Sequence, residues 1–381
     1  MKIGFVFDDT LDNPDGIQQY MASLAAYYTL QGHEVHYLVG ETSRTDIPNV
    51  HSMSRNVKVT FNGNRLSIPL WAPLKHVRAV LAAEQFDVLH VQVPYHPLMA
   101  GRIIKAAPAS TAVLGTFHVA PYSHLATAGS WLLGKWSQWS GSLHRFNGMV
   151  SVSPAASQLA QRTFGLKTEV VPNVFDYSRF HGAKPLPKYD DDIRTIVFLG
   201  RLVKRKGCLT LLQAVYKLVT DGRKYPAFRV VICGGGALEP SLRDYVTSHK
   251  LEDFIEFAGR VSEEDKPRYL ASADISAFPS SSGESFGIVL LEAMASGKSA
   301  VLGGDNPGYQ SVLGGRPSQL FAAKSADALA EKLSERLLNE TRRTGDALWG
   351  MTECEQYDAA TVGAKLLELY REVAPKAEST A

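Results

Sequence analysis

The sequence predicts an α/β protein with two domains, each built on a mostly parallel sheet. Short apolar runs alternate along the chain with stretches whose apolar residues recur at helical spacing. Such alternation is typical of parallel strands covered by helices on both faces. A chain of 381 residues is also longer than one ordinary core accommodates, so two domains are expected.

The first domain is expected to begin with a strand at 3–7, a short apolar run. A helix follows, because Ile17, Tyr20, Leu24 and Tyr28 recur every three or four residues. Further runs of the length of one buried strand lie at 35–39, 88–93, 113–117 and 149–152. These elements place the first domain at 1–180.

The alternation breaks at 181–192, where prolines, a glycine and three consecutive aspartates indicate a linker. It then restarts, which places a second domain of the same construction at 193–355. Residues 356–381 form a tail that is helical in pattern from 358 to 373. The strands expected in the second domain are 195–199, 228–233, 255–258 and 275–278, with helices after Gly207 and from about 286.

Composition excludes several classes of protein. A net charge of +2 is unlike that of a bulk nucleic-acid binder, and no apolar run is long enough to span a bilayer. The three cysteines are widely separated, which indicates free thiols in a reducing compartment. The histidines form no HExxH motif, and Asp190–Asp192 falls in the linker as a solvated charge run. No protein-held metal is therefore expected.

The segment 283–297 carries the most specific motif. A glycine-containing loop with Glu284 passes into an apolar helix with Glu292, eight residues later. Small residues allow close backbone approach to a ligand, and a helix start favours an anion such as a diphosphate. At helical spacing the two acids would lie roughly on one side of the element. Since acids bind sugar hydroxyls, the motif indicates a sugar–diphosphate ligand.

A basic loop, 200–207, opens the second domain between a strand and a helix. Ligands of open α/β sheets bind at the carboxyl ends of strands, where this loop lies. Arg201 can bind phosphate oxygens with two parallel hydrogen bonds, and Lys206 can act as a point charge. The alternative is a solvated basic loop without a ligand. Because the Glu284 motif also indicates a diphosphate, the phosphate site is the stronger interpretation.

Other loops follow predicted strands in the same way. Gly234–Gly236 does not complete the GxGxxG motif and suits a tight turn beside the nucleotide. The segment 259–262 is either a loop whose main chain contacts the nucleotide base or a plain connection. At 14–18, Gly16 opens a helix that favours an anion. His118 ends a strand. A single histidine is usually structural or on the surface, but a position at a strand end in an α/β fold favours a functional role.

Three tryptophans, Trp131, Trp136 and Trp139, cluster with basic residues in 130–145. Such a segment can lie at a membrane interface, line an acceptor pocket or belong to the core. The sequence leaves these three interpretations open.

Together, these motifs resemble those of retaining glycosyltransferases of family 4. The resemblance covers nearly the whole chain and rests on three motifs: Glu284 with Glu292, Gly200-Arg201…Lys206-Gly207, and Gly115-Thr116-Phe117-His118. Within the family the chain looks most like the phosphatidylinositol mannosyltransferases of the bacterial envelope. The resemblance implies the GT-B fold, two Rossmann-like domains facing across a cleft, with the C-terminal helix packing back toward the first domain.

The resemblance also implies roles for matching positions. Arg201 and Lys206 would neutralise the diphosphate, Glu284 would hold the donor sugar, and Glu292 the ribose. The implied catalytic residues are His118, Arg201, Lys206 and Glu284. The implied donor-binding residues are Gly16, Gly200, Gly235, Arg260, Val261, Lys266, Ser285, Phe286, Gly287, Ile288 and Glu292. Asp9, Gln18 and Tyr95 are implied for the acceptor.

The activity that follows is transfer of a hexose, with mannose favoured, from a nucleotide sugar to a lipid or glycan acceptor. GDP-mannose is the favoured donor, a UDP-sugar the alternative, and no cofactor is expected to be tightly bound. The resemblance implies a cytoplasmic protein at the inner face of the plasma membrane. Two other functions are weighed: a sugar-nucleotide epimerase on a similar fold, and a non-catalytic sugar-nucleotide or lipid-binding module.

Departures from the family pattern concentrate on the acceptor side. Pro14-Asp15-Gly16 stands where Pro-Gly-Gly is usual, and Asp8-Asp9 stands where the mannosyltransferases have Pro-Tyr. Ser296–Ala300 also lacks the more common Gly-x-Pro. The donor half is therefore expected to follow the family more closely than the acceptor half.

Overall fold

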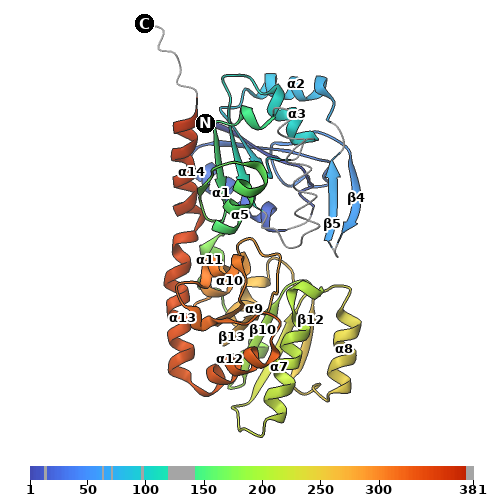
Figure 1. The fold of residues 1–381 in the computed structure, drawn as a ribbon, viewed down its shortest axis with the longest axis vertical. Coiled ribbons are helices and arrows are strands. Elements are labelled where there is room, and N and C mark those ends of the chain that lie inside the picture. Colours follow the sequence, from blue (N-terminus) through green and yellow to red (C-terminus); the bar gives the residue numbers. More distant parts are fainter. Residues whose placement is uncertain (13–14, 62–63, 70–71, 96–97, 119–141, 375–381) are drawn as a thin grey trace. The chain divides into compact units, whose positions relative to one another are not determined.

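The computed structural model describes residues 1–12, 15–61, 64–69, 72–95, 98–118 and 142–374. The chain divides into unit 1, Met1–Val174 with Ala359–Ala381, and unit 2, Phe175–Asp358. The chain thus enters unit 2 once and returns to unit 1 for its last helix (Figure 1).

Unit 1 is built on a seven-stranded sheet in the order β3-β2-β1-β6-β7-β8-β9. All neighbouring strands in it are parallel. A separate antiparallel hairpin joins β4 to β5. The strands are β1 Lys2–Phe7, β2 Glu34–Val39, β3 Val50–Ser52, β4 Asn56–Phe61, β5 Asn64–Pro69, β6 Val88–Gln92, β7 Ala112–Phe117, β8 Gly148–Ser151 and β9 Glu169–Val170.

Helices lie in most of the connections between these strands, β2 to β3 being an exception, and a further helix follows the last strand. They are α1 Gly16–Leu30, α2 Leu74–Glu84, α3 Met99–Ala106, η1 Ser142–Arg145, α5 Pro154–Leu159, the short π-helix η2 Ala160–Phe164, and α14 Ala359–Val373. The C-terminal helix α14 lies beside α1 (Figure 1). Its Tyr370 is fully buried and makes an edge-to-face contact with Tyr28 of α1. The expectation that the last helix packs on the first domain is confirmed.

Unit 2 repeats the plan with a six-stranded sheet in the order β12-β11-β10-β13-β14-β15. All of its strands are parallel. They are β10 Arg194–Leu199, β11 Phe228–Cys233, β12 Ile255–Gly259, β13 Ile275–Phe278, β14 Ala300–Gly304 and β15 Leu320–Phe321. When only the strands of each sheet are numbered, in chain order, both sheets begin 3-2-1-4-5-6. This is the strand order of dinucleotide-binding folds.

The helices of unit 2 cover both faces of its sheet. They are α6 Tyr177–Phe180, η3 Pro187–Tyr189, η4 Lys204–Lys206, α7 Cys208–Thr220, α8 Glu239–Ser248, α9 Lys266–Ala271, α10 Ile288–Ala295, α11 Pro307–Leu313, η5 Pro317–Gln319, α12 Ala326–Leu338, α13 Glu340–Cys354 and η6 Glu355–Tyr357. The predicted α/β fold with two parallel sheets is confirmed.

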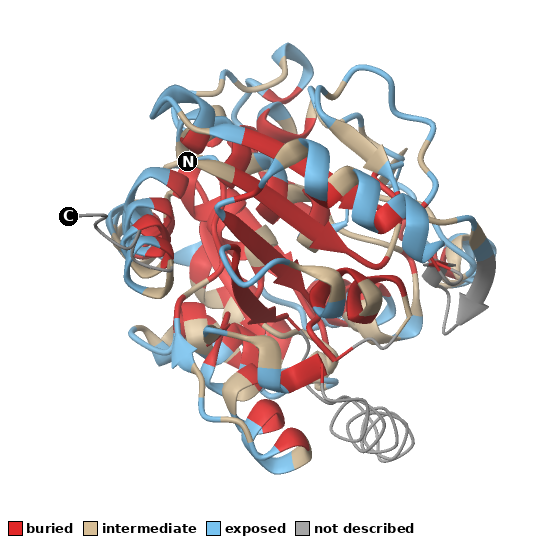
Figure 2. Cartoon of the chain, turned by 90° about the horizontal axis from the view of Figure 1, so that it is seen from above, coloured by how far each residue is buried: buried red, intermediate tan, exposed pale blue. Residues whose placement is uncertain are grey.

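Burial follows the layers. The central strands are buried on both faces, whereas many of the helices have a buried and an exposed side, as Figure 2 shows in red and pale blue. The helix α10 is an exception, since Leu290–Ala295 are all buried. In unit 2 the core joins Ile196, Val230 and Ile275 of three strands to Leu211 and Val215 of α7. The continuous apolar runs of the sequence are therefore two-sided buried strands.

The segment 181–192, expected as a linker, lies within unit 2. Tyr189 is buried there, and its hydroxyl donates a hydrogen bond to Glu256 of β12 at 2.8 Å. Asp191 forms an ion pair with Arg229 and accepts the backbone N–H of Ile193 at 3.0 Å. The aspartate run thus folds onto the sheet as part of this unit. The chain passes between the units beside Val174 and Asp358.

Candidate functional site

Each sheet has a point where the strand order reverses, and ligands of open α/β sheets bind outside the carboxyl ends of the strands at that point. In unit 2 this point lies between β10 and β13. The basic loop follows β10, and the loop with Glu284 follows β13. The topology of unit 2 therefore brings together the two motifs that the sequence singled out.

Glycines hold the basic loop against its neighbours. At Gly207, where φ is +72°, a Cβ atom would lie 2.0 Å from the carbonyl oxygen of Pro279. At Gly234 a Cβ would lie 1.9 Å from the carbonyl oxygen of Gly200. The loops after β10, β11 and β13 therefore pack backbone to backbone, which only glycine permits at these positions.

Glu284 forms the centre of the charged cluster. Its Oε1 accepts hydrogen bonds from Lys206 Nζ at 2.7 Å, Arg205 Nη1 at 3.1 Å and Ser280 Oγ at 2.6 Å. Burial raises the pKa of this carboxyl, but the charges of Lys206 and Arg205 outweigh it and leave the pKa below its usual value. Glu284 is therefore ionised at neutral pH, and it draws two cations to one point of the site.

Glu292 on α10 has a different partner. Lys266 Nζ at the start of α9 lies 2.7 Å from its Oε1, and both side chains are buried. Lys266 also reaches Oε2 of Glu263 at 3.0 Å, and Arg179 binds the same oxygen at 2.9 Å. Burial raises the pKa of Glu292 in spite of the nearby Lys266 charge. The second acid thus forms a buried pair with Lys266, and Glu263 and Arg179 continue the ion pairs toward the surface.

The start of α10 differs from the sequence expectation. The helix begins at Ile288, so Glu284 lies in the preceding loop and helical spacing does not relate it to Glu292. Gly287 caps the helix with a φ of +115°, and a Cβ there would lie 2.7 Å from the ring of Tyr309. The first N–H groups of the helix have no partner inside it, so Phe286, Gly287 and Ile288 present donors suited to an anion.

The remaining predicted donor residues lie on neighbouring loops of unit 2, except Gly16, which begins α1 of unit 1. Arg260, exposed after β12, packs over Gly235, because a Cβ at Gly235 would meet its side chain at 3.1 Å. Val261 follows it, and Ser285 lies between Glu284 and Phe286. Gly200 and Arg201 begin the basic loop. All these positions in unit 2 follow the carboxyl ends of β10–β13.

In unit 1, His118 directly follows β7 and is buried. Its Nε2 lies 2.6 Å from Oε1 of Gln92, the last residue of β6, and Gln92 Nε2 donates to the carbonyl oxygen of His90. That second bond turns the glutamine oxygen toward the ring, so Nε2 carries the proton and Nδ1 the lone pair. Tyr20 packs edge-on against the ring at 4.8 Å. Burial lowers the pKa of His118 to about 3, so it is neutral.

The predicted acceptor residues are partly brought together. Asp9 follows β1 and accepts the N–H of Thr10 at 2.7 Å, and Gln18 of α1 donates to the carbonyl oxygen of Thr10 at 3.0 Å. Gly16 is exposed at the start of the same helix. Tyr95 lies apart from them, buried and stacked on Phe164 at 4.9 Å. Its acceptor role stays a prediction.

Sequence reasoning missed several residues of the site. Arg205 was only one of a basic run, yet it binds Glu284. Ser280 lies just after β13, and this place at the end of a strand could have identified it as a site residue. Gln92 is the last residue of β6, so its place at a strand end was a signal of the same kind as that of His118. Gly308 had no signal in the sequence, although a Cβ there would meet the Glu284 carbonyl oxygen at 2.3 Å.

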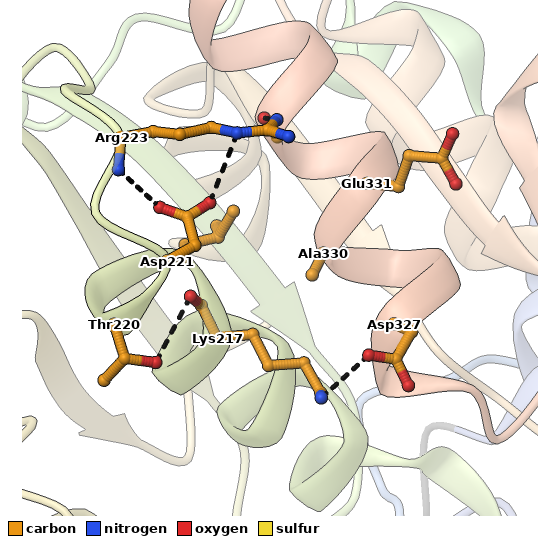
Figure 3. Close-up of a pocket in the computed structure, with 9 residues that line it drawn as sticks. Lys217, Thr220, Asp221, Arg223, Asp327, Ala330 and Glu331 are labelled. Atoms are coloured by element: carbon orange, nitrogen blue, oxygen red, sulfur yellow. Dashed lines mark hydrogen bonds and ion pairs between the residues drawn. The ribbon is translucent and has the colours of Figure 1, made fainter.

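A separate hollow of about 420 Å³ lies between α7 and α12 (Figure 3). Two ion pairs lie in its wall, Lys217 with Asp327 at 2.7 Å and Arg223 with Asp221 at 3.8 Å. The hollow lies near the end of α7 that leads toward the amino end of β11. It is therefore not part of the candidate site, which follows the carboxyl ends.

Two predictions concern the membrane. The tryptophans at 131, 136 and 139 lie outside the described residues, so the three interpretations of that cluster stay open. Among the helices in the described part of the chain, none has the length and apolarity needed to cross a bilayer.

Comparison with known proteins identifies the family. The family described as Glycosyltransferase Family 4 matches residues 14–179, and Glycosyl transferases group 1 matches residues 184–345. The phosphatidyl-myo-inositol mannosyltransferase of Mycolicibacterium smegmatis is 31% identical and aligns over 98% of this chain and 94% of that protein. The chain belongs to glycosyltransferase family 4. It is accordingly a glycosyltransferase, as the motifs predict.

Further relatives agree with this membership of family 4. The GDP-mannose-dependent alpha-(1-6)-phosphatidylinositol monomannoside mannosyltransferase of Mycobacterium tuberculosis is 29% identical over 53% of this chain and 55% of that protein. A glycosyltransferase from Rickettsia africae superimposes with a TM-score of 0.76 at 18% identity, covering 99% of both chains. The HepE protein of Anabaena, solved with UDP and glucose, gives 0.71 at 18% identity, covering 98% of this chain and all of that one. The predicted GT-B fold is confirmed.

Proposed function

We propose that this family 4 enzyme transfers mannose from GDP-mannose to the inositol ring of a phosphatidylinositol lipid, with retention of the anomeric configuration. The relative that aligns over nearly the whole chain bears the name of that lipid, and a second relative bears the name of that donor. Full-length similarity to a transferase also favours transfer over epimerisation or simple binding.

The observation that carries the proposal is the cluster around Glu284. Lys206 and Arg205 converge on one carboxylate oxygen at 2.7 and 3.1 Å, beside the start of α10. A diphosphate bound at the helix start would find two fixed cations and several N–H donors. Fixed charges of this kind stabilise the negative charge that develops on a leaving group. The cluster is suited to a departing nucleoside diphosphate.

Glu284 supports the proposal in a second way. Among the described residues, Arg205, Lys206 and Ser280 all bind its Oε1, and the carboxylate is ionised. A carboxylate held at the edge of an anion site can accept hydroxyl donors of a sugar attached to that anion. We propose that Oε2 accepts hydroxyl groups of the mannose, and that Lys206 and Arg205 offset the repulsion between carboxylate and phosphate.

Retention needs no covalent nucleophile in this scheme. The bond between the anomeric carbon and the diphosphate oxygen breaks, and the acceptor oxygen attacks the same face of the sugar. The proton of the acceptor hydroxyl passes to the departing phosphate oxygen, which becomes GDP. His118 is neutral and contacts the sugar as a hydrogen-bonding group, because its low pKa rules out a cationic role near pH 7.

The deciding experiment supplies GDP-mannose with and without phosphatidylinositol vesicles. We expect GDP release and a mannosylated lipid only when both are present, and NMR of the product should show the α-anomer. Release of GDP or conversion of the donor without lipid would favour hydrolysis or epimerisation. An unchanged donor across a broad panel of lipid and glycan acceptors would favour a binding module.

Contact with the membrane is a further part of the proposal, because the acceptor is a lipid and Trp131, Trp136 and Trp139 cluster with basic residues in the sequence. Cosedimentation with anionic vesicles is expected, and Trp136→Ser should weaken it. Trp349→Ser on α13 is the control for loss of a tryptophan. Equal sedimentation of the chain with and without vesicles would exclude this contact.

A further inference from the structure

Two histidines and a carboxylate meet at the amino end of the unit 1 sheet. His36 lies on β2, His51 on the edge strand β3, and Glu84 is the last residue of α2. Each residue offers one ligand atom, and these three atoms lie within 4.8 Å of one another. Within the described part of the chain, these residues form a group that could hold a metal ion. The predicted reaction residues Asp9 and His118 follow the carboxyl ends of strands in the same sheet, so this cluster is a separate feature.

Strand register creates the cluster. His51 is paired with Leu38 in the parallel ladder, and His36 precedes Leu38 by two residues on the same face. The two imidazole rings therefore lie nearly parallel, with centroids 5.2 Å apart and an interplanar angle of 6°. His36 Nδ1 and His51 Nε2 are 2.9 Å apart, so two nitrogen atoms face each other.

The surrounding carboxylates set the protonation of the rings. His36 Nε2 lies 2.8 Å from Oε1 of Glu34, which fixes the proton on Nε2 and leaves the lone pair of Nδ1 facing His51. Metal-bound histidines commonly have such a carboxylate on the second nitrogen, where it orients the ring and increases its basicity. Glu84 Oε1 lies 3.8 Å from His51 Nε2, close to the point where the rings meet.

These separations suit a tetrahedral ion. With metal–ligand bonds of about 2.0–2.1 Å, neighbouring ligand atoms should be about 3.3 Å apart. The observed 2.9 Å between nitrogens and 3.8 Å between nitrogen and carboxylate oxygen lie on either side of that value. Small side-chain rotations would equalise them. His51 and Glu84 are partly exposed, which leaves room for a water molecule as the fourth ligand.

Lys2 is the competing cation. Its Nζ lies 3.1 Å from Oε2 of Glu84 and 3.3 Å from Oε1 of Glu34. It therefore binds Oε2 of Glu84, which lies 3.8 Å from Nε2 of His36, and leaves Oε1 of Glu84 to face His51. The two carboxylates exceed this single ammonium charge by one, so the cluster retains net negative charge for a divalent ion.

We propose that His36 Nδ1, His51 Nε2 and Glu84 Oε1 form a site for a borderline divalent ion, Zn²⁺ above all, with Glu34 holding His36 from behind. On binding, the proton of His51 Nε2 moves to its Nδ1, and the ion replaces the hydrogen bond between the rings. Two imidazoles and one carboxylate are the ligand set that Zn²⁺ takes when one position stays open to water. The ion would tie the three-residue strand β3 to β2 and α2, away from the glycosyl-transfer site.

The test is titration of the tag-free, metal-stripped chain with Co²⁺, followed by displacement with Zn²⁺. We expect the intense visible bands of four-coordinate Co²⁺, their loss on adding Zn²⁺, and a rise in the melting temperature, since an ion that binds only the folded state stabilises it by mass action. His51→Ala should abolish the bands, and Glu34→Gln should weaken affinity about 10- to 100-fold. His144→Ala, an exposed histidine of unit 1, is the control.

Since His36 is buried, His51→Ala and Glu34→Gln are preferred variants, and their folding is checked by retained circular dichroism. Weak bands of six-coordinate Co²⁺ would overturn the proposal. Equal Co²⁺ affinity in His51→Ala and the unchanged chain would overturn it as well. Neither outcome bears on glycosyl transfer, which is assayed separately with GDP-mannose.

Discussion

At the scale of single residues, the two acids of the opening motif lie in opposite electrostatic environments. Glu284 has two cations and a hydroxyl on one oxygen, and its pKa is lowered. Glu292 has one lysine in a fully buried position, and its pKa is raised. Glu284 is therefore the acid that stays charged beside the proposed diphosphate. Glu292 holds α9 and α10 together through Lys266.

Replacing Lys206 by alanine tests the charge assignment. We expect kcat/KM for glycosyl transfer to fall about 100- to 1000-fold, the usual loss when one fixed group that stabilises developing charge is removed. Affinity for GDP should fall as well, since one of the two cations that bind Glu284 is removed. Steady-state rates and calorimetric binding of GDP measure both effects. Lys224→Ala, an exposed lysine of the same unit, should leave both values within twofold.

The buried histidines predict how stability responds to acid. Burial lowers the pKa of both His90 and His118 to about 3, whereas an unfolded chain protonates histidine near 6.5. Between these values only the unfolded state takes up the protons, so the free energy of unfolding falls as pH falls. Each histidine contributes about 1.4 kcal/mol per pH unit well below 6.5.

Urea unfolding of the chain and of His90→Asn between pH 7.5 and 5.0 measures this contribution. The variant should lose stability less steeply as pH falls, because it lacks one of the two neutral histidines. His144→Asn, which is exposed, should follow the unchanged chain. Parallel curves for the chain and His90→Asn would contradict the assignment of a buried neutral ring.

At the scale of elements, prediction from sequence succeeded for long apolar strands. The runs at 228–233 and 275–278 coincide with β11 and β13, because both are almost entirely buried and, apart from Arg229 and Ser276, apolar. The edge strands β3, β9 and β15 have only two or three residues, too few to show any period. They form because a neighbouring strand is already in place, which a local pattern does not reveal.

In the candidate site too, some features could be predicted from the local sequence and others could not. Loops at strand ends could be located from sequence, since parallel strands all end at one edge. Pairings within them could not, because Arg205 and Lys206 meet Glu284 only after a glycine lets two backbones approach. The expected helical relation of Glu284 to Glu292 was wrong, since α10 begins after Gly287.

Gly287→Ala tests the start of α10. The φ of +115° is unfavourable for alanine, and its Cβ would meet the Tyr309 ring at 2.7 Å. We expect a loss of about 1–3 kcal/mol in unfolding free energy and weaker GDP binding, because the helix start must move. Gly222→Ala is the matched control: φ is +76°, but no atom lies within 4 Å of the added Cβ. It should lose stability while keeping GDP affinity.

At the scale of the whole molecule, each unit has its own sheet and core, but unit 1 is completed by a distant part of the sequence. Tyr370 of α14 is fully buried, and its hydroxyl lies 2.6 Å from His90 Nδ1 on β6. Gly363 packs on α1, where a Cβ would meet the Tyr27 ring at 2.6 Å. The last helix is therefore part of the unit 1 core.

A chain ending at Asp358 tests this dependence. Unit 1 should become unstable and sensitive to protease, because α1 and β6 lose the helix that covers them. Unit 2 keeps all its elements, so it should still show a rise in melting temperature with GDP. Limited proteolysis and thermal scans with GDP, UDP and ADP separate the two effects. A chain ending at Ala374 should behave like the complete one.

The return of the chain to unit 1 also sets the order in which the protein can be made. A ribosome delivers the first sheet early, yet the helix that finishes its core emerges last, after all of unit 2. At about 5–20 residues per second, α14 is complete roughly 17 to 70 seconds after α1, and until then it cannot cover Leu24 and Tyr28, two side chains that are fully buried in the finished unit. All of unit 2 is therefore synthesised while unit 1 still lacks its last helix, so unit 1 cannot complete its core before the chain of unit 2 has been made.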